Sequence, residues 1–211
     1  MKSTEHSITT TKHARVFTFG NLQSSTKFIW LACHGYGMLA KFFIEKFEDF
    51  DPNEHFVIAP EGLSKAYIEG LTGRVGASWM TKEDRNNEII DYIHYIDIVY
   101  EQFITNQSAK IIAFGFSQGV TTITRWANAT NKKIDHLVLW AGNPGNELIT
   151  ENRISQLPIQ FILGDKDHFI SEDAKIHLNK AFEKAGFKYS TIIFEGGHSI
   201  DKAVLKNLKF N

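Results

Sequence analysis

The sequence has a single cysteine, Cys33, so no disulfide can form within the chain. It also has little net charge: 23 lysines and arginines stand against 24 aspartates and glutamates, which gives −1 at pH 7. Such a balance creates no long-range field, and we expect no nucleic-acid partner and no attraction to an anionic membrane surface. No apolar run approaches the ~20 residues that cross a bilayer, so no membrane span is predicted.

Signals for export or for division into domains are also lacking. Residues 1–11 are polar and contain neither the apolar region nor the cleavage site of a signal peptide, which predicts a cytoplasmic protein. There is no internal repeat, low-complexity tract or linker. The 211 residues, 43% of them apolar, suffice for one core, and we expect a single domain over residues 1–211. Composition leaves the oligomeric state open.

Short apolar runs alternate with stretches of helical periodicity from Phe28 onward. This alternation predicts βαβ units on a mostly parallel sheet, and the continuously apolar runs are typical of strands covered on both faces. An earlier segment, Arg15–Phe19, alternates in period two and is predicted to be an antiparallel edge strand. The other predicted strands are Phe28–His34, His55–Ala59, Lys110–Phe116, His136–Ala141, Ile159–Leu163 and Ser190–Phe194.

Helices are predicted between these strands. In the longest, Ile89, Ile90, Ile93, Ile96, Val99, Tyr100 and Phe103 recur every three or four residues and predict one apolar face packed on the sheet. Ser171 is the expected N-cap of a later helix and Gly186 its expected end. The glycine-rich segment Glu61–Trp79 has no sustained period and is predicted to be a loop that walls the binding crevice. The predicted helices are Ala40–Phe47, Arg85–Thr105, Gln118–Ala129, Glu172–Ala185 and Ile200–Lys206.

A Gly-x-Ser-x-Gly motif, residues 115–119, directly follows a predicted strand and directly precedes a predicted helix. The pentapeptide alone is common and can be an ordinary turn. In this context it is typical of a nucleophilic serine on a tight strand-to-helix turn, where flanking glycines relieve crowding. Ser117 is therefore the predicted nucleophile.

A serine hydroxyl needs a general base. Where the nucleophile lies on such a strand-to-helix turn, the order along the chain is serine, then the acid, then the histidine base. The histidines after Ser117 are His136, His168, His177 and His198. His136 opens a strand and His177 lies in a predicted helix, which favours structural roles. His198 follows the last strand in a glycine-rich loop that can place an imidazole over the sheet edge. It is the predicted base.

The acid is expected at the end of the preceding strand, where the sequence reads Gly164-Asp165-Lys166-Asp167. Asp165 could instead cap the turn by accepting bonds from backbone N–H groups, as aspartates beside glycine often do. Asp167 is favoured and Asp165 remains the alternative. Either would hold the imidazole in the correct tautomer without itself being protonated.

Acyl transfer also needs donors for the developing oxyanion. The backbone N–H of Gln118, which follows the nucleophile at a helix N-terminus, is one predicted donor. The loop His34-Gly35-Tyr36-Gly37 supplies the second, the backbone N–H of Tyr36. His34 has no neighbouring residue at metal-ligand spacing, and Cys33 is expected to be a small core residue. We expect no metal or cofactor.

Together these residues resemble the phospholipase/carboxylesterase family, which includes acyl-protein thioesterases. The matching motifs are His-Gly-x-Gly at 34–37, Ala-Pro at 59–60, Ser-Trp at 78–79, Gly-Phe-Ser-Gln-Gly at 115–119, Gly-Asp-x-Asp at 164–167 and Glu-Gly-x-His at 195–198. The resemblance implies an α/β-hydrolase fold, a three-layer α/β/α sandwich without a large cap. It also implies a triad of Ser117, Asp167 and His198, with oxyanion donors at Tyr36 and Gln118, acting on ester or thioester substrates.

The chain departs from the family pattern at the expected mouth of the pocket. Met38 stands where the family commonly has an acidic residue, and Trp79-Met80-Thr81 replaces a Trp-aromatic-Asp run. His168 replaces a frequent proline. The substrate-binding residues we predict are Met38, Leu39, Trp79 and Phe169, with Met80 a further candidate, around a pocket for small to medium acyl groups.

Other functions fit parts of the same pattern. A ligand-binding protein of this fold without catalysis would be expected to lack a member of the triad, and none is missing. A peptidase or an acyltransferase would keep the triad and differ in the substrate or the acceptor. A pure interaction protein would need a large exposed apolar or charged patch, and composition does not exclude one.

Overall fold

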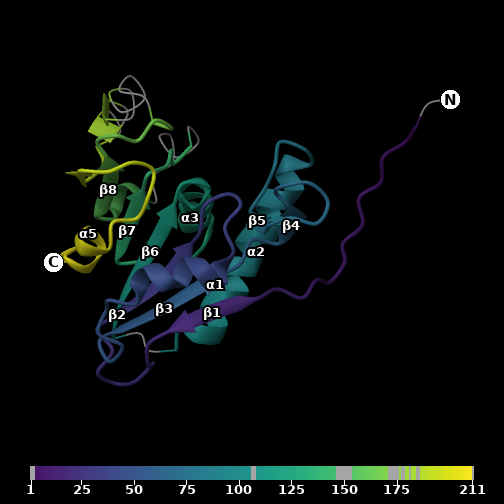
Figure 1. The fold of residues 1–211 in the computed structure, drawn as a ribbon. Helices are drawn as coiled ribbons and strands as arrows, with labels where there is room; N and C mark the ends of the chain where they lie inside the picture. Colours follow the sequence, from purple (N-terminus) through teal and green to yellow (C-terminus); the bar gives the residue numbers. More distant parts are fainter. Residues whose placement is uncertain are drawn as a thin grey trace.

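The computed structural model describes residues 3–105, 108–145, 154–170, 176, 179–180, 182–183 and 186–210. Its centre is a seven-stranded sheet in the order β1-β3-β2-β6-β7-β8-β9 (Figure 1). β1 (Val16–Phe19) pairs antiparallel with β3 (His55–Pro60) at one edge, as predicted, and the remaining pairs are parallel. The other strands are β2 (Phe28–Cys33), β6 (Lys110–Phe116), β7 (His136–Trp140), β8 (Ile159–Gly164) and β9 (Tyr189–Phe194).

Helices cover both faces of the sheet, because the parallel strands present apolar side chains in both directions. Leu31 of β2 faces a core shared with α2 (Arg85–Phe103) and α3 (Gln118–Ala129). Trp30 faces the opposite core, with residues of α1 (Ala40–Phe43), the 3₁₀ helix η1 (Ile44–Phe47) and α5 (Lys202–Lys206). A further 3₁₀ turn, η3, spans Ile154–Gln156. The result is the predicted three-layer α/β/α arrangement.

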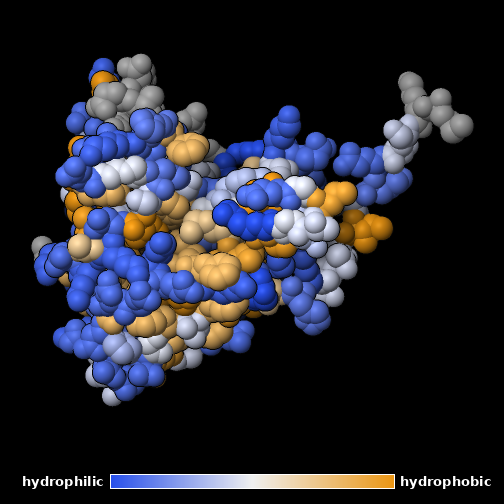
Figure 2. Space-filling model, in the orientation of Figure 1, coloured by the Kyte–Doolittle hydropathy of each residue, from blue (hydrophilic) through white to orange (hydrophobic). Residues whose placement is uncertain are grey.

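The segment Glu61–Trp79 is not the loop that the sequence predicted. It forms a two-stranded antiparallel sheet of β4 (Ser64–Tyr67) and β5 (Val75–Ser78). Strands of only four residues, one of which contains a glycine, give too little alternation to recognise. A tertiary contact supports them, because Ala77 forms a β-bridge with Met38. This hairpin exposes apolar side chains, including Leu71 at 88%, and Figure 2 shows hydrophobic beside hydrophilic surface on its side of the molecule.

The predicted apolar face of α2 is partly wrong. Ile90 is 63% exposed, whereas Tyr92 and Tyr95 are buried in the core. The tyrosines can be buried because their hydroxyls find partners: Tyr95 donates to the Arg15 carbonyl at 3.0 Å, and the Arg125 guanidinium donates to Tyr92 at 3.3 Å. The predicted face, which left out Tyr92 and Tyr95, was therefore rotated relative to the buried face that the structure shows.

The helix predicted over residues 172–185 and its N-cap Ser171 fall largely outside the described residues. Gly186 has a φ of 72°, the left-handed conformation expected of a residue that ends a helix. No helix among the described residues is long and apolar enough to cross a membrane. Within the same residues no inserted domain covers the carboxyl ends of the parallel strands, and the candidate site lies at those ends.

Candidate active site

Ser117 occupies a strained turn between β6 and α3. Its φ of 53° and ψ of −117° are unusual for a residue with a side chain, and such strain persists only where the surroundings impose it. Here the neighbouring backbone packs closely against the turn on both sides of Ser117. A Cβ added to Gly119 would lie 2.1 Å from the Cys33 carbonyl oxygen, and one added to Gly115 would lie 2.4 Å from the Gly119 carbonyl oxygen. The glycines on both sides of Ser117 are therefore required for backbone packing.

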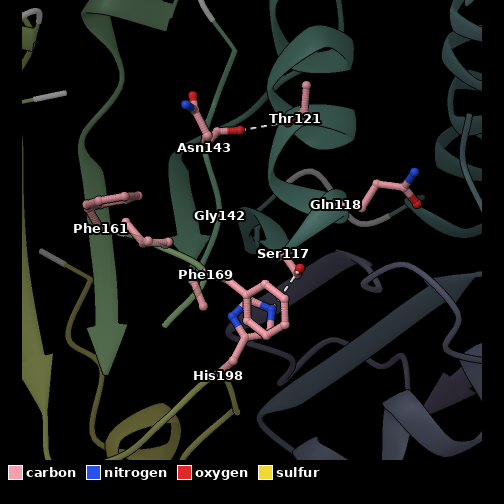
Figure 3. A pocket seen from close by; sticks show the side chains of 10 residues that line it. Ser117, Gln118, Thr121, Gly142, Asn143, Phe161, Phe169 and His198 are labelled. Carbon is pink, nitrogen blue, oxygen red and sulfur yellow. Dashed lines mark hydrogen bonds between the residues drawn. The ribbon is translucent and has the colours of Figure 1, made fainter. Parts of the chain in front are cut away.

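The structure brings Ser117, His198 and Asp167 together from three loops at the carboxyl ends of the sheet. Ser117 Oγ lies 2.9 Å from His198 Nε2, and His198 Nδ1 lies 2.8 Å from Asp167 Oδ2. These are hydrogen-bond distances in the order hydroxyl, imidazole, carboxylate. Figure 3 shows the bond from Ser117 to His198 at the cavity.

Asp167 is almost fully buried, and both of its carboxylate oxygens are used. Oδ2 faces the imidazole of His198, while Oδ1 accepts a bond from the Phe169 backbone N–H at 2.9 Å. The second bond fixes the rotation of the carboxylate toward the histidine. A buried carboxylate oriented in this way favours the Nδ1–H tautomer of His198, so that Nε2 is left to accept a proton.

Asp165, the alternative acid, is exposed and has a different partner. Its Oδ1 accepts a hydrogen bond from the Gly196 backbone N–H at 2.8 Å. The Lys166 backbone N–H donates in turn to the Gly196 carbonyl oxygen at 2.9 Å. Asp165 thus joins the loop of the aspartates to the loop of His198 and does not itself contact the imidazole.

Aromatic rings flank the imidazole of His198. The Phe116 ring centroid lies 5.2 Å from that of the imidazole, and the Phe169 centroid lies 4.7 Å from it. The two rings limit the positions open to the histidine, whose side chain is 22% exposed. Phe169 is 81% exposed and lines the cavity beside Ser117, so it lies where the cavity meets the surface.

The backbone N–H groups of Tyr36 and Gln118 have no acceptor within the described part of the chain. Their neighbours do: the Gly37 N–H donates to the Ala77 carbonyl at 2.9 Å, and the Met38 N–H donates to the Gly35 carbonyl at 3.2 Å. The loop also lies directly against the nucleophile, since a Cβ added to Gly35 would lie 3.1 Å from the Ser117 Cβ. Two donors are thus available near Ser117.

The Gln118 side chain connects the nucleophile turn to the loop after β5. Its Oε1 accepts a bond from the Trp79 backbone N–H at 3.2 Å, and its Nε2 donates to the Met80 carbonyl at 2.8 Å. The amide therefore points away from the hydroxyl of Ser117, as Figure 3 shows. What Gln118 offers to a reacting carbonyl is its backbone N–H.

A cavity of about 290 Å³ opens beside Ser117 and His198 (Figure 3). One wall is apolar and another is formed by the start of α3 and the segment after β7, which are joined by a bond of 2.6 Å from the Thr121 hydroxyl to the Asn143 carbonyl. The position of Gly142 must be glycine, because a Cβ there would lie 2.4 Å from the Ser117 carbonyl oxygen. The cavity is lined by Ser117, Gln118, Thr121, Ala141, Gly142, Asn143, Phe161, Phe169, Ile170 and His198.

Of the residues predicted to bind substrate, the structure brings Phe169 alone to this cavity. Trp79 is 1% exposed and lies in the core, where its indole N–H donates to the His34 carbonyl at 2.8 Å. Met38 is partly buried against the core on the α1 side, Leu39 precedes α1 as its N-cap, and Met80 is partly buried against the core on the α2 side. The sequence shows that these residues lie in loops beside the motifs, but it does not show whether an apolar side chain in such a loop turns toward the core or toward the cavity.

Phe161 and Ile170 line the cavity and were not among the predicted binding residues. Phe161 lies in the apolar run of β8, which indicates a core residue, and it is 1% exposed in the structure. Ile170 directly follows Phe169, and this position close to the Gly-Asp-x-Asp motif could have identified it as a cavity residue.

Cys33 is fully buried, and burial raises the pKa of its thiol, which agrees with its expected core position. Within the described residues no group of three or more histidine, cysteine or acidic side chains could hold a metal ion.

Comparisons with known proteins identify the family and the fold of the chain. The model of the dienelactone hydrolase family matches residues 55–202, a range that contains Ser117, Asp167 and His198. No curated protein matches the chain in sequence. Solved structures do match in fold. Acyl-protein thioesterase 2 from Zea mays has a TM-score of 0.66 and 17% identity over 90% of this chain and 93% of its own.

Two bacterial structures are similar to the same degree. The carboxylesterase of Bacillus cereus has a TM-score of 0.65 at 15% identity, covering 92% of this chain and 90% of its own. A phospholipase/carboxylesterase from Dyadobacter fermentans has a TM-score of 0.65 at 15% identity, covering 94% and 97%. At identities this low, the structural likeness establishes the fold alone. That fold is the α/β-hydrolase fold, as the motifs predicted.

Proposed function

Because the chain belongs to the dienelactone hydrolase family and is therefore a hydrolase, we propose that it cleaves carboxylic esters or thioesters with Ser117 as its nucleophile. The observation that carries the proposal is the continuous set of hydrogen bonds from Ser117 through His198 to Asp167, at 2.9 and 2.8 Å. A hydroxyl, an imidazole and a carboxylate in this order can generate a serine nucleophile at neutral pH.

In the proposed reaction, His198 Nε2 takes the proton of Ser117 Oγ as the oxygen attacks the acyl carbon. The carbonyl oxygen becomes an oxyanion, which the Tyr36 and Gln118 backbone N–H groups stabilise. His198 then gives its proton to the departing alcohol or thiol. Water, deprotonated by the same imidazole, attacks the acyl-enzyme and releases the acid and the free serine. These steps use no metal and no cofactor.

The size of the cavity favours small to medium acyl groups. Its volume of about 290 Å³ is at the lower end of the ~300–1,000 Å³ typical of small-molecule pockets. Phe161 closes its buried side, and Phe169 limits it at the surface. A long acyl chain would have to extend along the exterior, where the apolar surface it gains is smaller.

Hydrolysis of p-nitrophenyl esters from acetate to palmitate, with Ser117→Ala as the matched control, tests the proposal. We expect turnover of the short and medium esters by the wild type and loss of that turnover in the variant. Turnover that persists in Ser117→Ala would rule out this serine as the nucleophile. Folded wild-type protein that turns over none of the esters or the corresponding thioesters would contradict the proposed substrate class.

A further inference from the structure

His34 is a buried imidazole directly beside the predicted oxyanion donor, and the proposed reaction gives it no part. Its side chain is fully enclosed and has two hydrogen-bond partners. The Gly62 backbone N–H donates to His34 Nε2 at 2.9 Å, and His34 Nδ1 lies 2.8 Å from the Gly35 carbonyl oxygen. The His34 ring also lies against that of Trp79, with the centroids 5.1 Å apart.

These two partners determine which nitrogen carries the proton. A backbone N–H can only donate, so Nε2 must accept and be unprotonated. The proton of the neutral ring is then on Nδ1, which donates to the Gly35 carbonyl. Burial lowers the pKa of His34, against the smaller opposing influences of the Gly35 bond and of Glu61, so the ring stays neutral near pH 7.

The carbonyl that His34 binds belongs to the same peptide unit as the N–H of Tyr36. A trans peptide is planar, and its C=O and N–H point in opposite directions. Fixing the Gly35 carbonyl toward the imidazole therefore fixes the Tyr36 N–H on the other side, away from His34. Glycine at position 35 would otherwise allow this peptide to rotate, because no Cβ restricts it.

The next two peptides along the loop are held separately. The Gly37 N–H donates to the Ala77 carbonyl, and the Arg74 guanidinium donates to the Gly37 carbonyl at 3.3 Å. The Met38 N–H reaches the Gly35 carbonyl at 3.2 Å, a longer bond than the 2.8 Å from the imidazole. Among the described residues His34 is thus the side chain that bonds the peptide bearing the donor.

We propose that His34 is a positioning residue that aims the Tyr36 N–H at the oxyanion of the reacting ester. The role rests on the proposed function, since an oxyanion forms only if Ser117 attacks a carbonyl. His34 does not touch the substrate. It acts through one peptide unit, and its loss should therefore lower kcat and leave KM nearly unchanged, as expected of a contact made only in the transition state.

Two substitutions separate this role from a general structural one. In His34→Asn the amide nitrogen takes roughly the place of Nδ1 and can still donate to the Gly35 carbonyl, but the Gly62 N–H loses its acceptor. In His34→Gln the longer side chain brings its oxygen near the place of Nε2, which keeps the Gly62 bond and loses the Gly35 bond. The two variants each keep one hydrogen bond, so a purely structural role predicts similar losses.

The measurement compares kcat, KM and inhibition by a trifluoromethyl ketone, whose serine adduct carries an oxyanion. Rates are expressed per active site counted with a fluorophosphonate. We expect His34→Gln to lower kcat by about 10- to 100-fold, below the ~100- to 1,000-fold for complete loss of a donor, and to weaken the inhibitor by a similar factor. His34→Asn should stay within about threefold of the wild type in both.

Equal losses in the two variants, or a change confined to KM, would overturn the positioning role. The wild type provides a test that does not depend on the folding of a variant: a long-range ¹H–¹⁵N spectrum should show His34 as the Nδ1–H tautomer, and the Nε2–H tautomer would contradict the proposal. Wild-type ester turnover without a difference between the variants refutes this inference alone. Wild type that turns over no ester refutes the proposed function and this role with it.

Discussion

Asp165 and Gly196 are joined by a hydrogen bond of 2.8 Å that ties together the two loops carrying the predicted acid and the predicted base. The side chain that contacts the imidazole is that of Asp167, two residues later. Neighbouring aspartates of one motif thus have separable tasks: Asp165 holds the loops in place, and Asp167 faces His198.

The two aspartates should respond differently to the same substitution. Asp167→Asn is expected to lower kcat on the order of 10⁴-fold, because an amide in that place stabilises the wrong tautomer of the imidazole. Asp165→Asn keeps an oxygen that can accept from the Gly196 N–H and should change kcat by less than about tenfold. Steady-state kinetics on one ester decide the matter. The reverse ranking would assign the acid to Asp165.

Gly119 should not tolerate even a methyl group. The added Cβ of Gly119→Ala would lie 2.1 Å from the backbone oxygen of Cys33, so α3 or β2 would have to move. We expect destabilisation of about 1–3 kcal/mol, the usual cost of overpacking, together with a lower kcat as Ser117 is displaced. Urea unfolding and ester kinetics measure the two effects. Gly70→Ala is a useful control, because its Cβ would meet no atom within 4 Å, although its φ of 61° carries some strain.

Phe169 is expected to determine substrate size with little effect on folding. The residue is 81% exposed, so Phe169→Ala should change the free energy of unfolding by less than about 1 kcal/mol. Removing the ring widens the entrance, and kcat/KM should shift toward longer acyl chains. Phe161→Ala, which empties a buried site in the same cavity, should cost about 3–5 kcal/mol. An unchanged chain-length profile in Phe169→Ala would exclude Phe169 from the acyl site.

Stability should fall as the pH drops below about 6.5, partly because of His34. Burial lowers the pKa of His34 below its ordinary value of 6.5, so under acid conditions the unfolded chain binds a proton that the folded chain excludes. Unfolding is then favoured by at most ~1.4 kcal/mol per pH unit, and no such effect exists above the ordinary value. Burial lowers the pKa of His55 in the same direction, so the effect is shared.

Urea unfolding between about pH 7.5 and 5.5 separates the contribution of His34. The stability lost over this interval should be smaller in His34→Asn, which cannot bind the proton, than in the wild type. His55 remains in both proteins and cancels in the comparison. An equal loss in the two would mean that His34 is protonated as readily in the folded chain as in the unfolded one.

The sequence predicts most of the sheet because parallel strands leave long apolar runs. The predicted strands differ from the observed ones by about one residue at their ends, as at His34 and Gly164. The β4–β5 hairpin escaped prediction because its strands are stabilised by contacts such as that of Ala77 with Met38, 39 positions away in the chain. The burial of Tyr92 and Tyr95 in α2 was not predicted, because it depends on hydrogen-bond partners that are distant in the sequence.

For the candidate site, motifs predicted which residues converge, and they could not predict which way side chains turn. Ser117, Asp167 and His198 each follow a strand end, and parallel strand ends share one edge of the sheet. Trp79 follows a strand end as well, yet its indole turns into the core toward the His34 carbonyl. Phe161 lines the cavity from within β8, where nothing in the neighbouring sequence distinguishes it from the core residues of the same strand. The assignment of one domain stays a prediction.

The most direct test of the account is covalent labelling of the protein by a fluorophosphonate, with the modified residue located by peptide mass spectrometry. We predict a single adduct on Ser117 in the wild type, none in Ser117→Ala, and greatly slowed labelling in His198→Ala, which keeps the hydroxyl but lacks the base. An adduct on any other residue, or folded wild-type protein that takes up no label, would contradict the claim that Ser117 is an activated nucleophile.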